Sequence, residues 1–133
     1  MRPGVTGRPK PSREAEQQYE ADLALANRRA ELLDAAREAE ARFREAQARH
    51  APDAELRGPA EAFDAALTAA MRAAYAAQRA EIGPRGYDDR IYRRKAKATP
   101  RVRALTAEAE HLLTLRETHR LTGIPAVAFE PAP

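Results

Sequence analysis

The chain has 133 residues, of which 32% are charged and only 5% aromatic, and it contains no tryptophan. This length accommodates one domain with extensions, and its many alanines bury little apolar area, so we expect oligomers rather than a stable lone monomer. The absence of cysteine excludes disulfides and thiolate metal sites. No run of about 18 apolar residues is present, so we expect no contact with a membrane interior.

The net charge of +3 is unevenly distributed along the chain. Residues 1–13 carry four basic side chains and no acidic one. Residues 83–103 carry eight basic side chains against two acidic ones, Asp88 and Asp89. Two basic blocks around a mildly acidic body indicate a polyanionic partner, which is most often nucleic acid.

Taken in chain order, residues 1–12 are rich in proline and basic residues, and we interpret them as a flexible arm. Ser12 then predicts the start of a helix over residues 13–50. Its apolar residues recur at steps of four and three, which is typical of a seam between helices. We predict that this seam mediates oligomerisation through Tyr19, Leu23, Leu33 and Phe43.

A second helix is predicted over residues 59–82, between Gly58-Pro59 and Gly83-Pro84. It holds eleven alanines between Ala60 and Ala80, which allow another helix to approach closely. We expect the first two helices to form a long antiparallel hairpin.

Two shorter helices are predicted next, over residues 88–98 and 100–122. Thr99 and Pro100 suit the start of the last helix, and Gly123 is expected to end it in the left-handed conformation. Residues 124–133 form a predicted extended, proline-rich tail, in which Ile124, Val127 and Phe129 are candidates for binding a partner. The expected fold is therefore all-α, with a helical domain over residues 13–123 and an extended arm at each end.

The sequence contains no catalytic motif that we recognise, so we do not expect an enzyme. Glu108 and His111 form a single Glu-x-x-His pair, whereas di-metal helical bundles need two such pairs and further glutamates. Gly-rich phosphate loops and Ser-His-Asp sets are missing as well. We therefore expect no metal and no cofactor.

The basic block is the strongest functional signal in the sequence. Arg90, Arg93, Arg94 and Lys97 recur at steps of three and four, which places them along one helical face, and the other cations of the block widen that face. Such a face can bind the phosphates of a nucleic acid, and Tyr87 and Tyr92 could stack on its bases or sugars. An acidic protein partner, or a solvated face paired with carboxylates of the first helix, are the alternatives. The candidate DNA-binding residues are Arg90, Arg93, Arg94, Lys95, Lys97, Arg101 and Arg103, with Arg8 and Lys10 in the arm.

The segment KATPRVRALTAEAEHLLTLRETHRLTGIPA resembles the C-terminal signature of P27-like phage terminase small subunits. The residues that match are Pro100, Val102, Arg103, Leu112, Leu113, Leu115, Gly123, Ile124 and Pro125. Upstream, LTAAMRAAYAAQRAEIG is similar to an Ala/Tyr-rich helix of that family, and Gly7 to Pro11 is similar to its openings. The resemblance covers residues 67–125 and the short arm. The chain lacks the tryptophan-bearing segment usual in the family.

The resemblance implies an all-helical, ring-forming protein that recognises viral DNA and presents it to a large packaging subunit. Such a protein has no catalytic activity of its own. It would act in the cytoplasm of a bacterial host or within a virion assembly. The alternative is a structural virion or adaptor protein that attaches to neighbouring subunits through its arms.

Overall fold

The computed structural model describes residues 10–126, and its regular secondary structure over that range is helical, without a strand. The all-α class expected from the sequence is therefore confirmed. None of the helices in this range is both long and apolar enough to cross a bilayer. The helices are α1 (Arg13–Ala26), α2 (Arg29–Ala48), α3 (Asp53–Ile82), α4 (Arg85–Asp88), α5 (Arg90–Lys97) and α6 (Pro100–Thr122).

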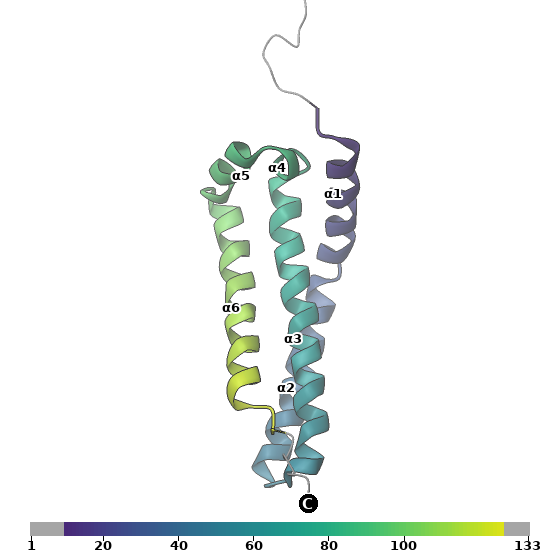
Figure 1. The fold of residues 1–133 in the computed structure, drawn as a ribbon, viewed down its shortest axis with the longest axis vertical. Helices are drawn as coiled ribbons and strands as arrows, with labels where there is room; N and C mark the ends of the chain where they lie inside the picture. Colours follow the sequence, from purple (N-terminus) through teal and green to yellow (C-terminus); the bar gives the residue numbers. More distant parts are fainter. Residues whose placement is uncertain (1–9, 127–133) are drawn as a thin grey trace, which may run out of the picture. The chain divides into compact units, whose positions relative to one another are not determined.

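The described chain divides into two compact units, and α3 and α6 each contribute one segment to both of them (Figure 1). Unit 1 joins residues 10–29 to residues 72–109, and it contains α1, the end of α3, α4, α5 and the start of α6. Unit 2 joins residues 30–71 to residues 110–126, and it contains nearly all of α2, the start of α3 and the end of α6.

The helix predicted over residues 13–50 is divided in the structure into α1 and α2. α1 ends at Ala26 and is followed by Asn27, a residue type of low helix propensity, and a turn through Arg28 leads into α2. α2 ends at Ala48, shortly before His50 takes a positive φ of 54°. The apolar seam is therefore interrupted between Leu23 and Leu33.

The second long helix, α3, begins at Asp53, earlier than the predicted start at Pro59. The carbonyl oxygen of Pro52 accepts a hydrogen bond from the amide of Glu55 at 2.9 Å, which starts the helix. Asp53 and Glu55 lie in its first turn, where negative charge is favoured by the helix dipole. Pro59 is consequently an internal residue of α3 rather than its first.

The segment predicted as one helix over residues 88–98 is interrupted at Asp89, which has an extended backbone and separates α4 from α5. α6 has the predicted range of 100–122. The predicted left-handed conformation at Gly123 is wrong, since Gly83 is the glycine with positive φ (97°) among the described residues. Gly123 serves close packing instead: an added Cβ would lie 2.3 Å from Nδ1 of His119.

The core of unit 1 consists mainly of small side chains. Ala15 of α1 and several alanines in the second part of α3 are buried, together with a few larger residues at the end of α3 and the start of α6. Gln78 is also buried, and its amide nitrogen donates to the Thr106 hydroxyl at 2.8 Å. The buried apolar residues of this unit are Ala15, Ala73, Ala74, Ala76, Ala77, Ile82, Val102, Leu105 and Ala109.

The core of unit 2 is built around three aromatic rings. Phe43 of α2 lies 6.0 Å from Phe63 of α3, and the His119 ring of α6 lies 4.9 Å from Phe43 and 4.7 Å from Phe63. Nε2 of His119 is 2.7 Å from the Ala60 carbonyl oxygen. Phe43 is completely buried within its own unit, so we no longer assign it to an interface between copies.

Candidate nucleic-acid interface

The basic helix α5 is fixed at its start by Asp89. The Asp89 carboxylate accepts the amide of Tyr92 at 2.9 Å, which satisfies one free donor of the first turn. This backbone hydrogen bond holds the pKa of Asp89 below its ordinary value of 3.8, against the opposing effect of burial and with help from Arg85. Asp89 is therefore ionised at neutral pH.

The first described residues of the chain lie close to this helix. The backbone amide and the hydroxyl of Ser12 both donate to the carboxylate of Asp88, at 2.7 and 3.0 Å. Lys10 is exposed and lines a surface hollow together with Asp88 and Arg85. Lys10, the described basic residue of the arm, therefore lies beside α4 in unit 1, where Ser12 joins the chain to α4.

Five predicted DNA-binding residues on α5 and at the start of α6 are exposed to solvent. Within residues 10–126, no carboxylate forms an ion pair with any of them. Their charge is therefore available to an external anion. These residues are Arg90, Arg94, Lys95, Lys97 and Arg103.

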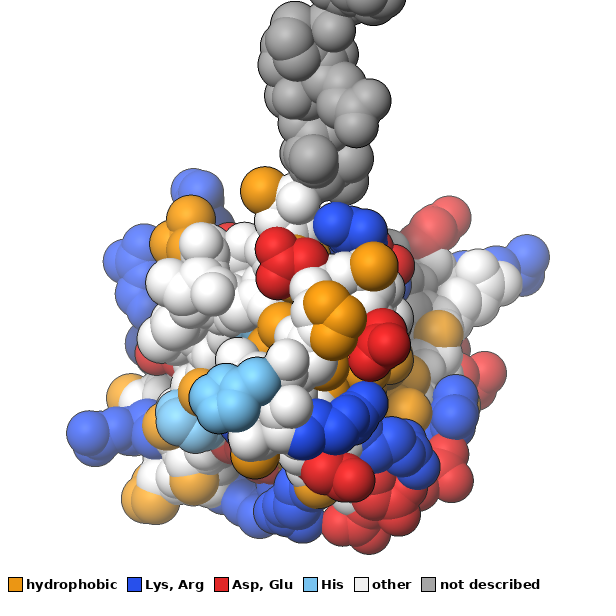
Figure 2. All heavy atoms as spheres, turned by 90° about the horizontal axis from the view of Figure 1, so that it is seen from below, with side chains coloured by type: hydrophobic (Ala, Val, Ile, Leu, Met, Phe, Trp, Pro, Cys, Tyr) orange, Lys and Arg blue, Asp and Glu red, His pale blue; other side chains and the backbone are white. Residues whose placement is uncertain are grey.

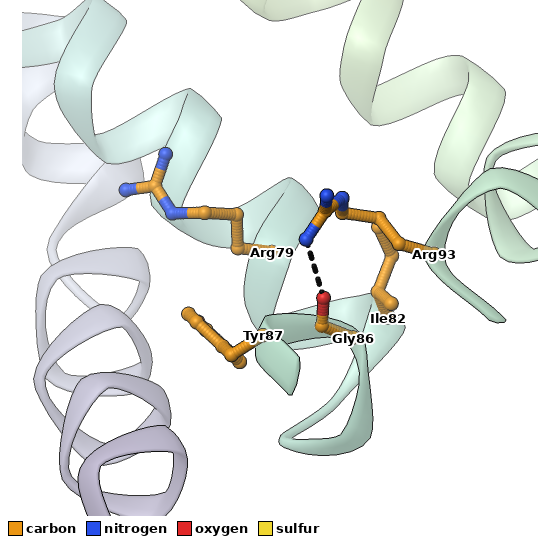
Figure 3. Close-up of a pocket in the computed structure, with 5 residues that line it drawn as sticks. All are labelled: Arg79, Ile82, Gly86, Tyr87 and Arg93. Atoms are coloured by element: carbon orange, nitrogen blue, oxygen red, sulfur yellow. Dashed lines mark hydrogen bonds between the residues drawn. The ribbon is translucent and has the colours of Figure 1, made fainter. Parts of the chain in front are cut away.

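Two other predicted DNA-binding residues have partners inside unit 1. Arg101 lies 3.5 Å from the Glu81 carboxylate, an exposed pair of the kind that contributes little to stability. Arg93 is half-buried, and its guanidinium donates to the Gly86 carbonyl oxygen at 2.7 Å beside a cavity of about 40 Å³ (Figure 3). The helical spacing grouped Arg93 with the exposed cations, but α4 occupies that side of α5.

Tyr87 also has a structural partner. Its hydroxyl donates a short hydrogen bond to the Asp22 carboxylate, which also accepts from the Arg79 guanidinium at 2.8 and 3.0 Å. Burial and the hydrogen bond to Asp22 raise the pKa of Tyr87 above its ordinary value. The expectation that Tyr87 stacks on bases is therefore corrected. Nothing in the sequence pairs Asp22 with residues so distant along the chain.

Tyr92, the second tyrosine of the basic segment, is half-buried on α5. The Arg85 guanidinium carbon lies 4.5 Å from the centre of its ring, which is a cation–π stack. Arg85 also lies 3.3 Å from Asp89, which orients the guanidinium. The result is a layered arrangement of a planar cation on an aromatic ring next to the exposed lysines and arginines.

The cations of α2 differ from those of α5. Three exposed arginines of α2 each have a carboxylate one helical turn earlier: Arg37–Asp34 at 3.0 Å, Arg42–Glu38 at 3.9 Å and Arg44–Glu40 at 3.7 Å. Such alternation of sign weakens the local field. Figure 2 likewise shows basic and acidic side chains next to each other on the face it presents.

The remaining predicted contact residues are distributed over both units. Tyr19 of α1 and Leu33 of α2 are half-buried, whereas Leu23 of α1 is 40% exposed. Ile124 follows α6 and is half-buried in unit 2. The other three predicted contacts, Arg8, Val127 and Phe129, lie outside the described residues.

The Glu-x-x-His pair considered for a metal has a different environment. Glu108 accepts hydrogen bonds from the Arg29 guanidinium, including one of 3.0 Å from Nε. Within residues 10–126, no group of three histidine or carboxylate side chains is arranged to hold a metal ion. Glu108 therefore pairs with Arg29 in unit 1, whereas His111 is exposed to solvent.

No protein-family model, no curated protein and no solved structure matches this chain.

Proposed function

We propose that this protein is a non-catalytic DNA-binding subunit that holds the phosphate backbone through α5 and the start of α6. One observation supports this most: Arg90, Arg94, Lys95, Lys97 and Arg103 are exposed and lack carboxylate partners within residues 10–126. Cations that are not neutralised internally attract phosphates, and binding gains free energy when the DNA releases its condensed counterions.

The resemblance to P27-like terminase small subunits suggests the process in which this binding takes place. In that role the protein recognises viral DNA in the bacterial cytoplasm and delivers it to a large packaging subunit. The matching segment includes Arg103 and the whole of α6. The chemistry of packaging would belong to the large subunit, which fits a chain without a recognised catalytic motif.

We also propose that the chain works as an oligomer, closed into a ring and built from antiparallel helical hairpins. Contact between Phe43 and Phe63 supports a hairpin of α2 with the start of α3. The predominance of alanine in both cores supports a need for further burial between copies. Tyr19, Leu23 and Leu33 are the proposed contacts, with the arms attaching to neighbours.

A structural virion or adaptor role is the second candidate, and it predicts an acidic protein as the partner of the basic surface. The same exposed cations support it, because carboxylates and phosphates both attract them. The two roles differ in their response to DNA, so binding to duplex DNA separates them.

The test is the affinity for labelled duplex DNA, measured by fluorescence anisotropy over a series of salt concentrations. Four or five phosphate contacts predict a slope of about −4 when the logarithm of the association constant is plotted against that of the salt concentration. Absent binding, or binding that does not respond to salt, would contradict the proposed function. Native mass spectrometry of the same sample tests the oligomer, and a monomer at micromolar concentration would contradict it.

A further inference from the structure

A groove of about 420 Å³ lies beside the exposed cations of α5 in unit 1. Residues of α4, α5 and the turn before α6 form its walls. Arg85, Asp89, Ile91, Tyr92, Lys95 and Thr99 line it. The groove thus opens next to the surface to which we assign phosphate binding, and it contains groups that phosphate binding does not need.

Ile91 is the first such group, because its side chain is 68% exposed on an otherwise basic helix. Arg94 and Lys95 follow it by three and four residues, so they are its neighbours on the helix surface. Methyl groups add nothing to the attraction of a phosphate. An apolar side chain among cations is suited to the face of a base or to a sugar.

Tyr92 and Arg85 form a second such group on the wall of the same groove. The guanidinium lies over the ring at 4.5 Å, and the Asp89 carboxylate fixes its orientation from 3.3 Å. Planar cations and aromatic rings are the surfaces on which unpaired bases stack. Two side chains with planar groups therefore line this groove, and Asp89 holds one of them in place.

Asp89 determines which part of a nucleotide can enter. Its carboxylate is ionised, so it repels a phosphate from the interior of the groove. The same oxygens can accept hydrogen bonds from the amino or imino groups of a base. Lys95, on the rim, is placed to attract the phosphate that precedes or follows that base.

We propose that this groove binds an unpaired nucleobase of a DNA strand whose phosphates are held by the cations of α5. This rests on the proposed function and extends it, since it makes single-stranded extensions or frayed ends better ligands than an uninterrupted duplex. The base contributes stacking against Ile91 and the Arg85–Tyr92 pair, and the flanking phosphates contribute the salt-dependent part of the affinity.

Three labelled DNAs test this inference with the full chain: a blunt duplex, the same duplex with a short thymidine extension, and the same duplex with an abasic extension of equal length. The abasic extension keeps the added phosphates and removes the bases. We expect the thymidine extension to bind about tenfold more tightly than the abasic one, as one stacked base provides.

Ile91→Ser should weaken this preference, because it removes one of the two surfaces on which the base stacks, and Leu121→Ser is the matched control. Leu121 is 85% exposed at the end of α6 in unit 2, so its replacement alters surface apolarity elsewhere without disturbing a core. Equal affinity for thymidine and abasic extensions, or a preference that Ile91→Ser leaves unchanged, would overturn the inference, whereas salt-dependent binding to all three DNAs would still uphold the proposed function. No binding to any of the DNAs would overturn both.

Discussion

Asp22 is the residue through which α1 is attached to α3 and α4. One carboxylate accepts two hydrogen bonds from Arg79 and one from Tyr87, and its side chain is only 14% exposed. Hydrogen bonds that involve a charged, poorly solvated group are among the stronger ones in proteins. In a unit whose buried side chains are mainly alanine, this polar link supplies much of the specific attachment of α1.

Replacing Asp22 by Asn should lower the free energy of unfolding by about 1.5–3 kcal/mol, because the ionic partner of Arg79 is lost. Asp34→Asn is the matched control, since Asp34 pairs with Arg37 in an exposed position of α2. Its effect should stay within about 0.5 kcal/mol. Urea denaturation followed by circular dichroism measures both. Equal effects of the two substitutions would contradict the role we assign to Asp22.

The same carboxylate predicts how stability depends on pH. Burial raises the pKa of Asp22, but the hydrogen bonds from Arg79 and Tyr87 outweigh it, so the net pKa is below its ordinary value of 3.8. A lowered folded-state pKa gives stability that is present above the unfolded-state pKa and is lost as the pH falls through the folded-state value. The melting temperature should therefore decline below about pH 4 to 5.

Asp22→Asn removes this titration, so the difference in stability between wild type and variant should shrink as the pH falls from 7 to 3. Asp64 contributes in the same direction in both proteins, because its hydrogen bond from Arg120 lowers its pKa. Thermal melts at several pH values measure the difference. A gap that stays constant over this range would show that Asp22 acts through packing rather than through its charge.

At the scale of the elements, the end of α6 depends on one close contact. An added Cβ at Gly123 would lie 2.3 Å from Nδ1 and 2.8 Å from Cε1 of the His119 ring. His119 is buried and its ring packs against Phe43 and Phe63, so moving the ring away would break these contacts. The glycine is required by the ring rather than by the backbone angle expected from the sequence.

Gly123→Ala should therefore destabilise unit 2 by about 1–3 kcal/mol, the usual cost of overpacking. In a His119→Ala background the same substitution should cost much less, because the ring that it meets is gone. Gly58→Ala is the control: nothing lies within 4 Å of its added Cβ. A full effect of Gly123→Ala in both backgrounds would contradict the contact with the ring as its cause.

Signals carried by neighbouring residues allowed several elements to be predicted. Pro100 and the spacing of Val102, Leu105 and Leu112 define α6, whose range is as expected. The interruption at Asn27 was missed, because one residue of low helix propensity is a weak signal within a long periodic segment. The early start of α3 was missed because Gly58-Pro59 is a stronger signal for the start of a helix than Pro52. In the structure, Pro52 precedes the first turn of α3, and Gly58 and Pro59 lie inside the helix.

The candidate site was predictable only in part, for a related reason. Helical spacing placed Arg90, Arg93 and Arg94 on neighbouring positions, but it contains no information on which side of α5 the preceding helix covers. The structure places Arg93 against Gly86 and leaves Arg90 and Arg94 exposed. The pairing of Tyr87 with Asp22 spans 65 residues, so no local pattern could reveal it.

At the scale of the whole molecule, the uneven pairing of surface charges distinguishes two helical surfaces. The exposed arginines of α2 alternate with carboxylates of the same helix, whereas the exposed cations of α5 have no ion-pair partner within residues 10–126. Removing three cations from α2 and removing three from α5 lower the net charge of the protein by the same amount. An effect of net charge alone would therefore be equal for the two surfaces. A DNA-binding role for α5 requires that the two sets of substitutions differ.

The decisive measurement is therefore the salt-dependent affinity for duplex DNA of two triple variants, one with Arg90, Arg94 and Lys97 changed to Gln and one with Arg37, Arg42 and Arg44 changed to Gln. We expect the α5 variant to bind more than about tenfold more weakly and its salt slope to decrease in magnitude by about 2 to 3, while the α2 variant keeps the wild-type slope. Equal losses in both variants, or an unchanged slope in the α5 variant, would contradict the assignment of α5 as the DNA-binding surface.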